Sequence, residues 1–303
     1  MIIVQLQGGL GNQMFQYALG RALSLKNNTS LGLDLNFLED RTPRDTFLQK
    51  RFSKWGTFVF RNYDLGIFNI EENFVSQKEI PFFYRSFFSG TPMIYADAFR
   101  KKFFPGRNVE KSFKFDREVL GLGPNAYLMG SWQSFKYFED IEDVIRRDFA
   151  LKKPISEKSQ TLLGEINSCQ SLCINVRRAD FVDNSHHGTI GNEYYNMAIS
   201  IILQTRKIDK IYVFSDDMAW CEKNLSFSQP TMFVNHEYAG KKFEEYLVLM
   251  TACKNFIIPN STFGWWAAWL SGEKDKVVIA PKKWFADSDV DTSDLIPSDW
   301  IRL

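Results

Sequence analysis

The stretch IIVQLQGGLGNQMFQYALGRAL, residues 2–23, decides the fold of the N-terminal half. Its first part, Ile2–Leu6, is a short apolar run typical of a buried strand. Gly8–Gly11 then form a glycine-rich turn, and apolar residues between Met14 and Leu25 recur at helical spacing. A strand, a tight turn and a helix in this order predict the first β–α unit of a parallel sheet.

The rest of the N-terminal half carries fewer signals. Apolar runs predict strands at Leu31–Asp34 and Ala126–Met129, and periodicity predicts a helix at Phe138–Phe149. Between Asn36 and Gly123 the sequence is rich in Phe, Arg and turn residues and is interrupted by prolines. We expect helices and long loops there, without placing individual elements.

The C-terminal half alternates short apolar runs with helical patterns, which predicts a parallel sheet with helices on both faces. Strands are expected at Leu172–Val176, Ile211–Phe214, Thr231–Val234, Phe256–Ile258 and Val277–Ala280, and helices at Glu193–Gln204, Met218–Asn224, Phe243–Cys253 and Phe263–Leu270. We therefore expect two Rossmann-like α/β domains, residues 1–154 and 155–303. They would face each other across a cleft, with the ligand at the carboxyl ends of the strands.

Composition narrows the class of protein. The 303 residues carry 37 Lys and Arg against 36 Asp and Glu, and this balance argues against a nucleic-acid partner. The four cysteines form no C-x-x-C pair, so we expect reduced thiols in a cytoplasmic protein. No apolar run is long enough for a transmembrane helix, and the N-terminus lacks the basic region of a signal peptide. Aromatic residues reach 16%, which indicates an aromatic core or rings that line a sugar site.

The glycine-rich turn is the first candidate ligand site. Glycines between a strand and a helix let backbone N–H groups and the helix N-terminus approach an anion. A dinucleotide fingerprint requires a third glycine where Met14 stands, so NAD binding is disfavoured, although Asp34 ends the next strand near the ribose position. The structural alternative is a tight turn in which Asn12 caps the helix.

Polar residues also follow the strands of the C-terminal half. Asn175 and Arg177 share one face of their strand, and a planar guanidinium at the strand end suits a pyrophosphate. Arg178 could equally form a surface pair with Asp180. Asp216 and its neighbour at 217 could bind a metal or ligand hydroxyls, or the residue at 217 could cap the next helix.

Three further segments carry polar residues that could bind a ligand or a metal. Asn260, Ser261 and Thr262 precede a helix, where small polar side chains form a second anion cradle. The acidic loop at residues 287–291 lacks the glycine and the closing glutamate of a calcium loop, so we expect a solvated turn. The paired histidines at 186 and 187 lie in a polar loop, which we expect to be a flap.

Three motifs together resemble the bacterial α-1,2-fucosyltransferases of glycosyltransferase family 11. They are Gly8–Phe15, Val176–Asp180 and Asn260–Trp266, and their order and spacing match over almost the whole chain, least so in residues 36–123. The resemblance implies a GT-B-like fold. It also implies an inverting transfer of L-fucose from GDP-β-L-fucose to the 2-hydroxyl of a galactosyl glycan, without a metal or another cofactor.

The resemblance assigns roles to individual residues. Arg177 is expected on the β-phosphate, and Arg178 is expected to support the strand. Asn12 would approach the phosphate or the fucose from the other domain. The remaining substrate-binding residues expected from the motifs are Gly9, Leu10, Gly11, Gln13, Asn175, Asp180, Ser215, Asp216, Asn260, Ser261, Thr262 and Phe263.

Two positions depart from the family pattern. Asn175 stands where the family's His-x-Arg-Arg-x-Asp motif begins with His, so no imidazole acts there. Tyr246 stands where similar proteins have Asp, and Glu245 is the substitute that we expect to meet the N–H donors of guanine. For the general base that deprotonates the acceptor hydroxyl, the candidate of the first domain is Asp34.

The alternatives are a Rossmann-type NAD(P)-dependent oxidoreductase, a non-catalytic glycan-binding protein and a metal-dependent glycosyltransferase that uses the acidic loop. The expected acceptor is an oligosaccharide or a lipid-linked glycan, reached in the cytoplasm or peripherally at the inner membrane face. We expect the acceptor to bind the aromatic N-terminal half, around residues 37–115, and GDP-fucose to bind residues 155–303.

Overall fold

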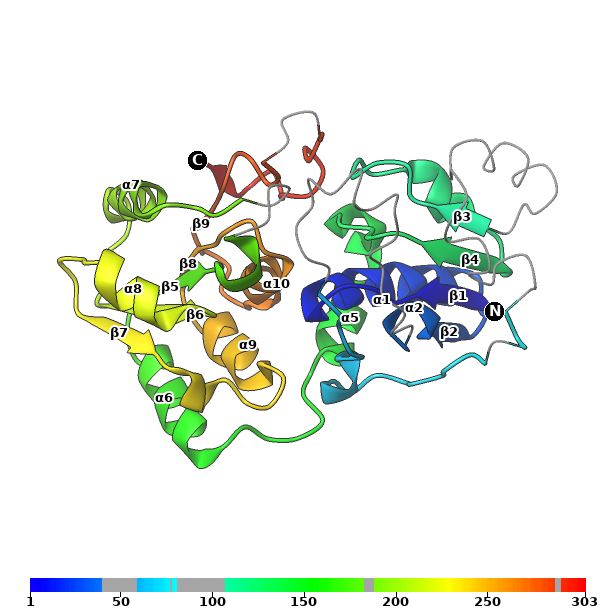
Figure 1. Cartoon of the computed structure of the whole chain (residues 1–303), viewed down its shortest axis with the longest axis horizontal. Helices are drawn as coiled ribbons and strands as arrows, with labels where there is room; N and C mark the ends of the chain where they lie inside the picture. The colour runs from blue at the N-terminus through cyan, green and yellow to red at the C-terminus, as the bar shows by residue number, and fades with distance from the viewer. Residues whose placement is uncertain (40–58, 77, 81–106, 183–187, 287–289) are drawn as a thin grey trace. The chain divides into compact units, whose positions relative to one another are not determined.

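The computed structural model describes residues 1–39, 59–76, 78–80, 107–182, 188–286 and 290–303 (Figure 1). Residues 183–187 of the predicted flap, which include both of its histidines, and residues 287–289 of the acidic loop lie outside the described residues. The chain forms two compact units. The N-terminal unit contains the described parts of residues 1–43, 60–150 and 291–295, and the C-terminal unit contains the described parts of residues 44–59, 151–290 and 296–303.

The N-terminal unit is built on a four-stranded parallel sheet of order β2-β1-β4-β3. The strands are β1 (Ile2–Gln5), β2 (Leu31–Asp34), β3 (Arg107–Val109) and β4 (Ala126–Met129). β1 pairs on both sides and is buried along its length, which explains its unbroken apolar run. The three strands predicted in this half are confirmed, and β3 lies in the stretch where no element was placed.

Helix α1 (Leu10–Lys26) follows β1 and packs against it. Gly20 permits this close packing, because a Cβ there would lie 2.7 Å from Leu31 Cδ1 and 3.3 Å from Val4 Cγ1. The unit also contains α2 (Asn36–Glu39) and α5 (Glu142–Asp148). The predicted helix at 138–149 is confirmed in α5, and its first residues form a 3-10 turn instead.

The C-terminal unit contains a six-stranded parallel sheet of order β10-β9-β8-β5-β6-β7. Its strands are β5 (Ser171–Val176), β6 (Lys210–Ser215), β7 (Thr231–Val234), β8 (Asn255–Ile257), β9 (Val278–Ala280) and β10 (Ile301–Arg302). Its helices are α6 (Glu157–Asn167), α7 (Asn192–Leu203), α8 (Met218–Asn224), α9 (Glu244–Thr251) and α10 (Thr262–Leu270). The five predicted strands and four predicted helices are confirmed, whereas α6 and β10 were not predicted.

Helices cover both faces of this sheet, as predicted. Val213 of β6 packs in one cluster with Tyr195 of α7 and Cys221 of α8. The next residue, Phe214, points to the opposite face and meets Tyr246 of α9 edge-on, with ring centroids 5.2 Å apart. β5, which lies inside the sheet, is therefore buried along its whole length.

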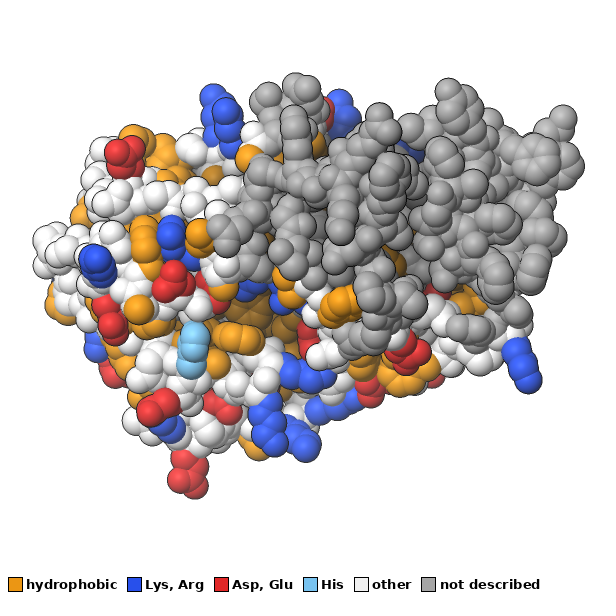
Figure 2. Space-filling model, viewed as in Figure 1, with side chains coloured by type: hydrophobic (Ala, Val, Ile, Leu, Met, Phe, Trp, Pro, Cys, Tyr) orange, Lys and Arg blue, Asp and Glu red, His pale blue; other side chains and the backbone are white. Residues whose placement is uncertain are grey.

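The aromatic content of the C-terminal unit is largely core. Trp265 and Trp266 of α10 are fully buried, and Trp269 and Trp300 complete the same cluster. This confirms core packing as the main role of these indoles. Acidic and basic side chains are interspersed on the described part of the face in Figure 2. Among the described residues, no helix has both the length and the apolar character needed to cross a membrane.

Candidate functional site

The carboxyl ends of β5 and β6 bring the predicted arginines and acids together. Val176 is in register with Ser215, so the residues that follow each strand are neighbours. Arg177 Nη1 lies 3.0 Å from Asp216 Oδ2. The Asp216 carboxylate also accepts the backbone N–H groups of Arg178 (2.8 Å) and Ala179 (3.2 Å). Asp216 therefore fixes the turn after β5 and orients the guanidinium of Arg177.

Arg178 has partners of its own. Its guanidinium lies over the ring of Trp220, 4.1 Å from the centroid, and its Nε is 3.4 Å from Asp217 Oδ2. Asp217 caps α8, because its side chain accepts the N–H of Trp220. The side chain of Arg177 is 28% exposed and that of Arg178 is 16% exposed. The pair thus divides into a supported Arg178 and a more accessible Arg177.

Ser215 connects this cluster to a histidine that no motif marks. Ser215 Oγ accepts the N–H of Asp217, and the Ser215 carbonyl lies 2.9 Å from His236 Nε2. His236 lies two residues after the end of the predicted strand at β7 and stands beside the rings of Phe243 and Tyr246. The sequence could have marked His236 as a site residue by its position after a strand of the same parallel sheet, because the carboxyl ends of these strands meet at one edge.

Asn175 joins β5 to α10. The side chain is buried, and its Nδ2 donates to the Phe214 carbonyl at 3.2 Å. A Cβ on Gly264 of α10 would lie 2.6 Å from Asn175 Oδ1, so this helix approaches the amide closely. Asn175, which replaces the family's histidine, therefore packs between the sheet and α10, the helix that begins at the predicted cradle.

The predicted cradle lies at the start of α10. Ser261 is the extended N-cap residue and its side chain makes no capping bond. Asn260 Nδ2 donates to the Trp284 carbonyl at 3.1 Å, which orients the loop after β8. Thr262 and Phe263 are half-buried in the first helical turn. β8 pairs with β5, so this segment shares the sheet edge with Arg177.

Glu245 and Tyr246 occupy different surroundings. Glu245 accepts from the backbone N–H (3.2 Å) and the hydroxyl (2.7 Å) of Ser156, at the start of α6. Burial raises the pKa of Glu245, but hydrogen bonds from Ser159 and Ser156 outweigh it and lower the pKa overall. The buried Tyr246 donates to the Val234 carbonyl at the end of β7. Tyr246, and not Glu245, thus stands beside His236.

The glycine-rich turn is observed after β1. Gly8 has a φ of 75°, and a Cβ there would lie 2.5 Å from Asn12 Nδ2. The structural alternative, in which Asn12 caps α1, is wrong, because Gly9 occupies the N-cap position and α1 begins at Leu10. Asn12 Oδ1 instead accepts from Gln133 Nε2 at 3.1 Å.

Two other predicted residues of this unit are deeply engaged. Gln13 is fully buried, donates to the carbonyls of Gly8 and Asn62, and accepts the N–H of Asp64. Asp34 is 1% exposed and accepts from Tyr127 and from the backbone and side chain of Asn36. The side chains of Gln13 and Asp34 thus form hydrogen bonds within the N-terminal unit. The side chain of Asp180 lies outside the described residues.

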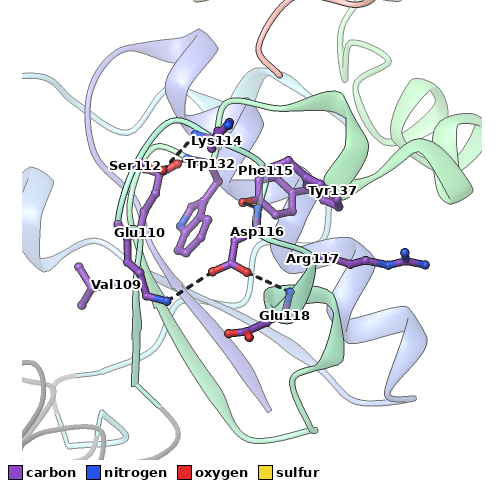
Figure 3. A pocket seen from close by; sticks show the side chains of 11 residues that line it. Val109, Glu110, Ser112, Lys114, Phe115, Asp116, Arg117, Glu118, Trp132 and Tyr137 are labelled. Carbon is purple, nitrogen blue, oxygen red and sulfur yellow. Dashed lines mark hydrogen bonds and ion pairs between the residues drawn. The ribbon is translucent and has the colours of Figure 1, made fainter. Parts of the chain in front are cut away.

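The N-terminal unit also has a pocket of about 410 Å³ beyond the ends of β3 and β4 (Figure 3). Glu110 accepts the backbone N–H groups of Ser131 (2.6 Å) and Trp132 (2.9 Å). Burial raises the pKa of Glu110 to about 7, against these two hydrogen bonds, which lower it. The lining residues are Val109, Glu110, Lys111, Ser112, Lys114, Phe115, Asp116, Arg117, Glu118, Trp132 and Tyr137.

The chain has the GT-B-like fold expected from the sequence, with one parallel sheet in each of its two units. The structure is similar to a crystal structure of the α-1,6-fucosyltransferase NodZ with GDP, at a TM-score of 0.50 and 15% identity, over 88% of this chain and 91% of that one. The family model of glycosyl transferase family 11 matches residues 109–303. The chain belongs to this family, which disfavours the oxidoreductase alternative.

Two relatives from Escherichia coli match along the whole chain. An α-1,2-colitosyltransferase is 30% identical, with 100% of this chain and 99% of the relative covered. The O-antigen biosynthesis glycosyltransferase WbnK is 32% identical, with 98% and 99% covered. The human galactoside α-(1,2)-fucosyltransferase 1 is 27% identical over 52% of this chain and 46% of its own length.

Proposed function

We propose that the protein transfers L-fucose from GDP-β-L-fucose to the 2-hydroxyl of a galactosyl glycan, with inversion and without a metal. The observation that carries the proposal is Arg177, oriented by Asp216 at the end of β5. Breaking the bond between the sugar C1 and the phosphate oxygen leaves negative charge on GDP. A fixed guanidinium stabilises that charge in the transition state.

The neighbouring segments complete the proposed donor site in residues 155–303. Thr262 and Phe263, in the first turn of α10, would contact the diphosphate and the nucleoside, beside the helix N-terminus. Arg178 would hold the strand end through Trp220 and Asp217. In residues 1–154, Gly9, Leu10, Gly11 and Asn12 would approach the phosphate or the fucose. Arg177 and the helix N-termini, instead of a metal, would stabilise the charge of the leaving group.

The direct test is Arg177→Ala. Removal of one transition-state donor should lower kcat by about 10²–10³-fold. Arg146→Ala is the matched control, since Arg146 pairs with Glu142 on the exposed side of α5 and should keep full turnover. Folding of both variants is checked by circular dichroism. Normal turnover by a folded Arg177→Ala variant would refute the assignment.

The donor sugar needs its own test, because a colitosyltransferase is 30% identical along the full length. Colitose is fucose without the 3-hydroxyl. A site that hydrogen-bonds this hydroxyl should reject the deoxy donor by orders of magnitude in kcat/KM. We expect GDP-fucose to be preferred in a direct competition, with activity retained in EDTA. Preference for GDP-colitose would reassign the donor and leave the glycosyl transfer intact.

The acceptor is proposed to be an oligosaccharide or a lipid-linked glycan. Linkage analysis of the product from a galactoside acceptor array should return an α-1,2 bond. Peripheral action at the inner membrane face is part of the same proposal, and cell fractionation tests it: the protein should appear in the cytoplasm or be released from membranes by high salt.

A further inference from the structure

The pocket of the N-terminal unit is joined to the glycine-rich turn. Gln133, in the loop after β4, donates to Asn12, and Gln16 of α1 donates to the carbonyl of Gly130 at 3.0 Å. Gly130 in turn packs closely against Glu110, since a Cβ at position 130 would lie only 2.4 Å from the Cβ of Glu110. The loop after β4 therefore connects the pocket to the turn proposed to approach the donor.

Trp132 is the unusual residue of this pocket. It is 1% exposed, and its backbone φ is 55°, a conformation that bulky residues rarely adopt. Its indole Nε1 is buried without a hydrogen-bond partner in the part of the chain that the structure describes. A buried unpaired donor and a strained backbone are both costly, and such features concentrate at ligand sites.

The groups around Trp132 suit a neutral sugar ring. The indole meets the Tyr137 ring edge-on, with ring centroids 5.8 Å apart, and Figure 3 shows it beside Phe115, Tyr137 and Asp116, while Arg117 extends away. The Phe115 and Tyr137 rings lie 4.9 Å apart and offer an apolar surface. Lys111 Nζ is 3.8 Å from Asp116, so these two charges offset each other. Hydrogen-bonding groups beside aromatic rings match the alternation of hydroxyls and apolar C–H faces in a hexose.

We infer that this pocket binds one ring of the glycan acceptor, with the Trp132 indole N–H donating to a sugar oxygen and Glu110 hydrogen-bonding to a sugar hydroxyl. The inference rests on the proposed function, and it names the acceptor subsite of that reaction. A pocket of about 410 Å³ falls in the size range of small-molecule sites. The near-neutral pKa of Glu110 lets the carboxyl either accept or donate such a bond at physiological pH.

The first experiment measures sugar binding without chemistry. Methyl β-D-galactopyranoside is titrated into the full-length protein, with and without GDP, and binding is followed by saturation-transfer NMR. Trp132→Phe should weaken binding about tenfold, since it removes one hydrogen bond to the ligand. Its folding stability should change little, because the removal of a buried donor without a partner offsets the volume that is lost with the indole. Trp269→Phe, in the core of the C-terminal unit, should leave binding unchanged.

The second experiment separates acceptor from donor. Trp132→Phe and Glu110→Gln should each raise the acceptor KM about tenfold and leave the GDP-fucose KM unchanged. Wild-type acceptor KM in both variants would overturn the pocket while fucosyl transfer stands. Galactoside binding that Trp132→Phe weakens, in a protein that transfers no fucose, would support a sugar site and refute the proposed function. If the protein binds no galactoside and neither variant changes the acceptor KM, the inference is refuted. Glu110→Gln tests the pocket independently, so this conclusion holds even if Trp132→Phe misfolds.

Discussion

At the scale of single residues, the environment sets the role of each carboxyl group. Asp216 lies beside Arg177 and two backbone N–H groups, and it acts as an orienting anion. Glu110 has no cation at salt-bridge distance among the described residues, and only backbone N–H groups offset its burial. Its pKa is therefore raised to about 7 from an unfolded value near 4.5.

This raised pKa predicts a pH-dependent contribution to stability. Between about pH 4.5 and 7 the folded protein binds the Glu110 proton and the unfolded chain releases it, so stability falls as pH rises through this window. Glu110→Gln loses one hydrogen bond to the backbone at every pH. It also removes the fall in stability with pH, because an amide does not titrate in this range. We therefore compare the free energies of unfolding of the two proteins, measured in urea. From pH 5 to pH 8, the value for the variant should rise by about 1–3 kcal/mol relative to the value for the wild type. Parallel curves for the two proteins would contradict the assigned pKa.

The residues of the candidate site were predictable to different degrees. Arg177 and Asn260–Phe263 directly follow strands with clear apolar patterns, so their place at a sheet edge followed from the sequence. Glu110 could not be found this way, because its function depends on Trp132, 22 residues away in the chain. The role of Glu245 likewise depends on Ser156, a contact across 89 residues that no local pattern encodes.

At the scale of elements, the predictions succeeded where burial imposes a pattern. β5 and β6 are apolar because neighbouring strands and helices enclose them. β3 has three residues, RNV, and β10 has two exposed residues, so neither carries an apolar run. α6 buries only Ser159, Leu162 and Ile166, so few apolar residues mark this helix in the sequence.

Two glycines in helices give a matched prediction. Gly264→Ala in α10 should destabilise the protein by about 1–2 kcal/mol, because the new Cβ would push Asn175 Oδ1 from 2.6 Å and displace its bond to the Phe214 carbonyl. Gly164→Ala in α6 meets nothing within 4 Å, so it should stabilise by about 0.5–1 kcal/mol. Chemical denaturation measures both changes, and an equal effect at the two sites would contradict the close packing at Asn175.

At the scale of the whole molecule, the chain returns to its first unit near its end. Residues 291–295 belong to the N-terminal unit, although residues 151–290 and 296–303 form the other one. Asp294 anchors this segment: its carboxylate accepts the N–H of Phe115 (3.1 Å) and pairs with Lys136, and its carbonyl accepts from Ser134 Oγ (2.8 Å). No sequence pattern marks such a crossing, because each contact spans more than 150 residues.

Removal of this anchor should loosen the N-terminal unit. Asp294→Ala leaves the N–H of Phe115 and the ammonium of Lys136 without their acceptor, which should cost about 1–3 kcal/mol. Scanning calorimetry should show a midpoint lower by several degrees, and acceptor KM should rise, because Phe115 lines the pocket. Asp299→Ala, at an exposed position near the C-terminus, is the control and should change neither quantity.

The returning segment also has a consequence for synthesis on the ribosome. The N-terminal unit leaves the exit tunnel first, and domains generally fold in that order as they emerge. The partner of Phe115, Ser134 and Lys136 is Asp294, which is synthesised more than 150 residues after each of them. The nascent N-terminal unit must therefore persist without the segment at residues 291–295 while strands β5 to β9 of the second sheet are translated, and these contacts form only after residue 294 has emerged.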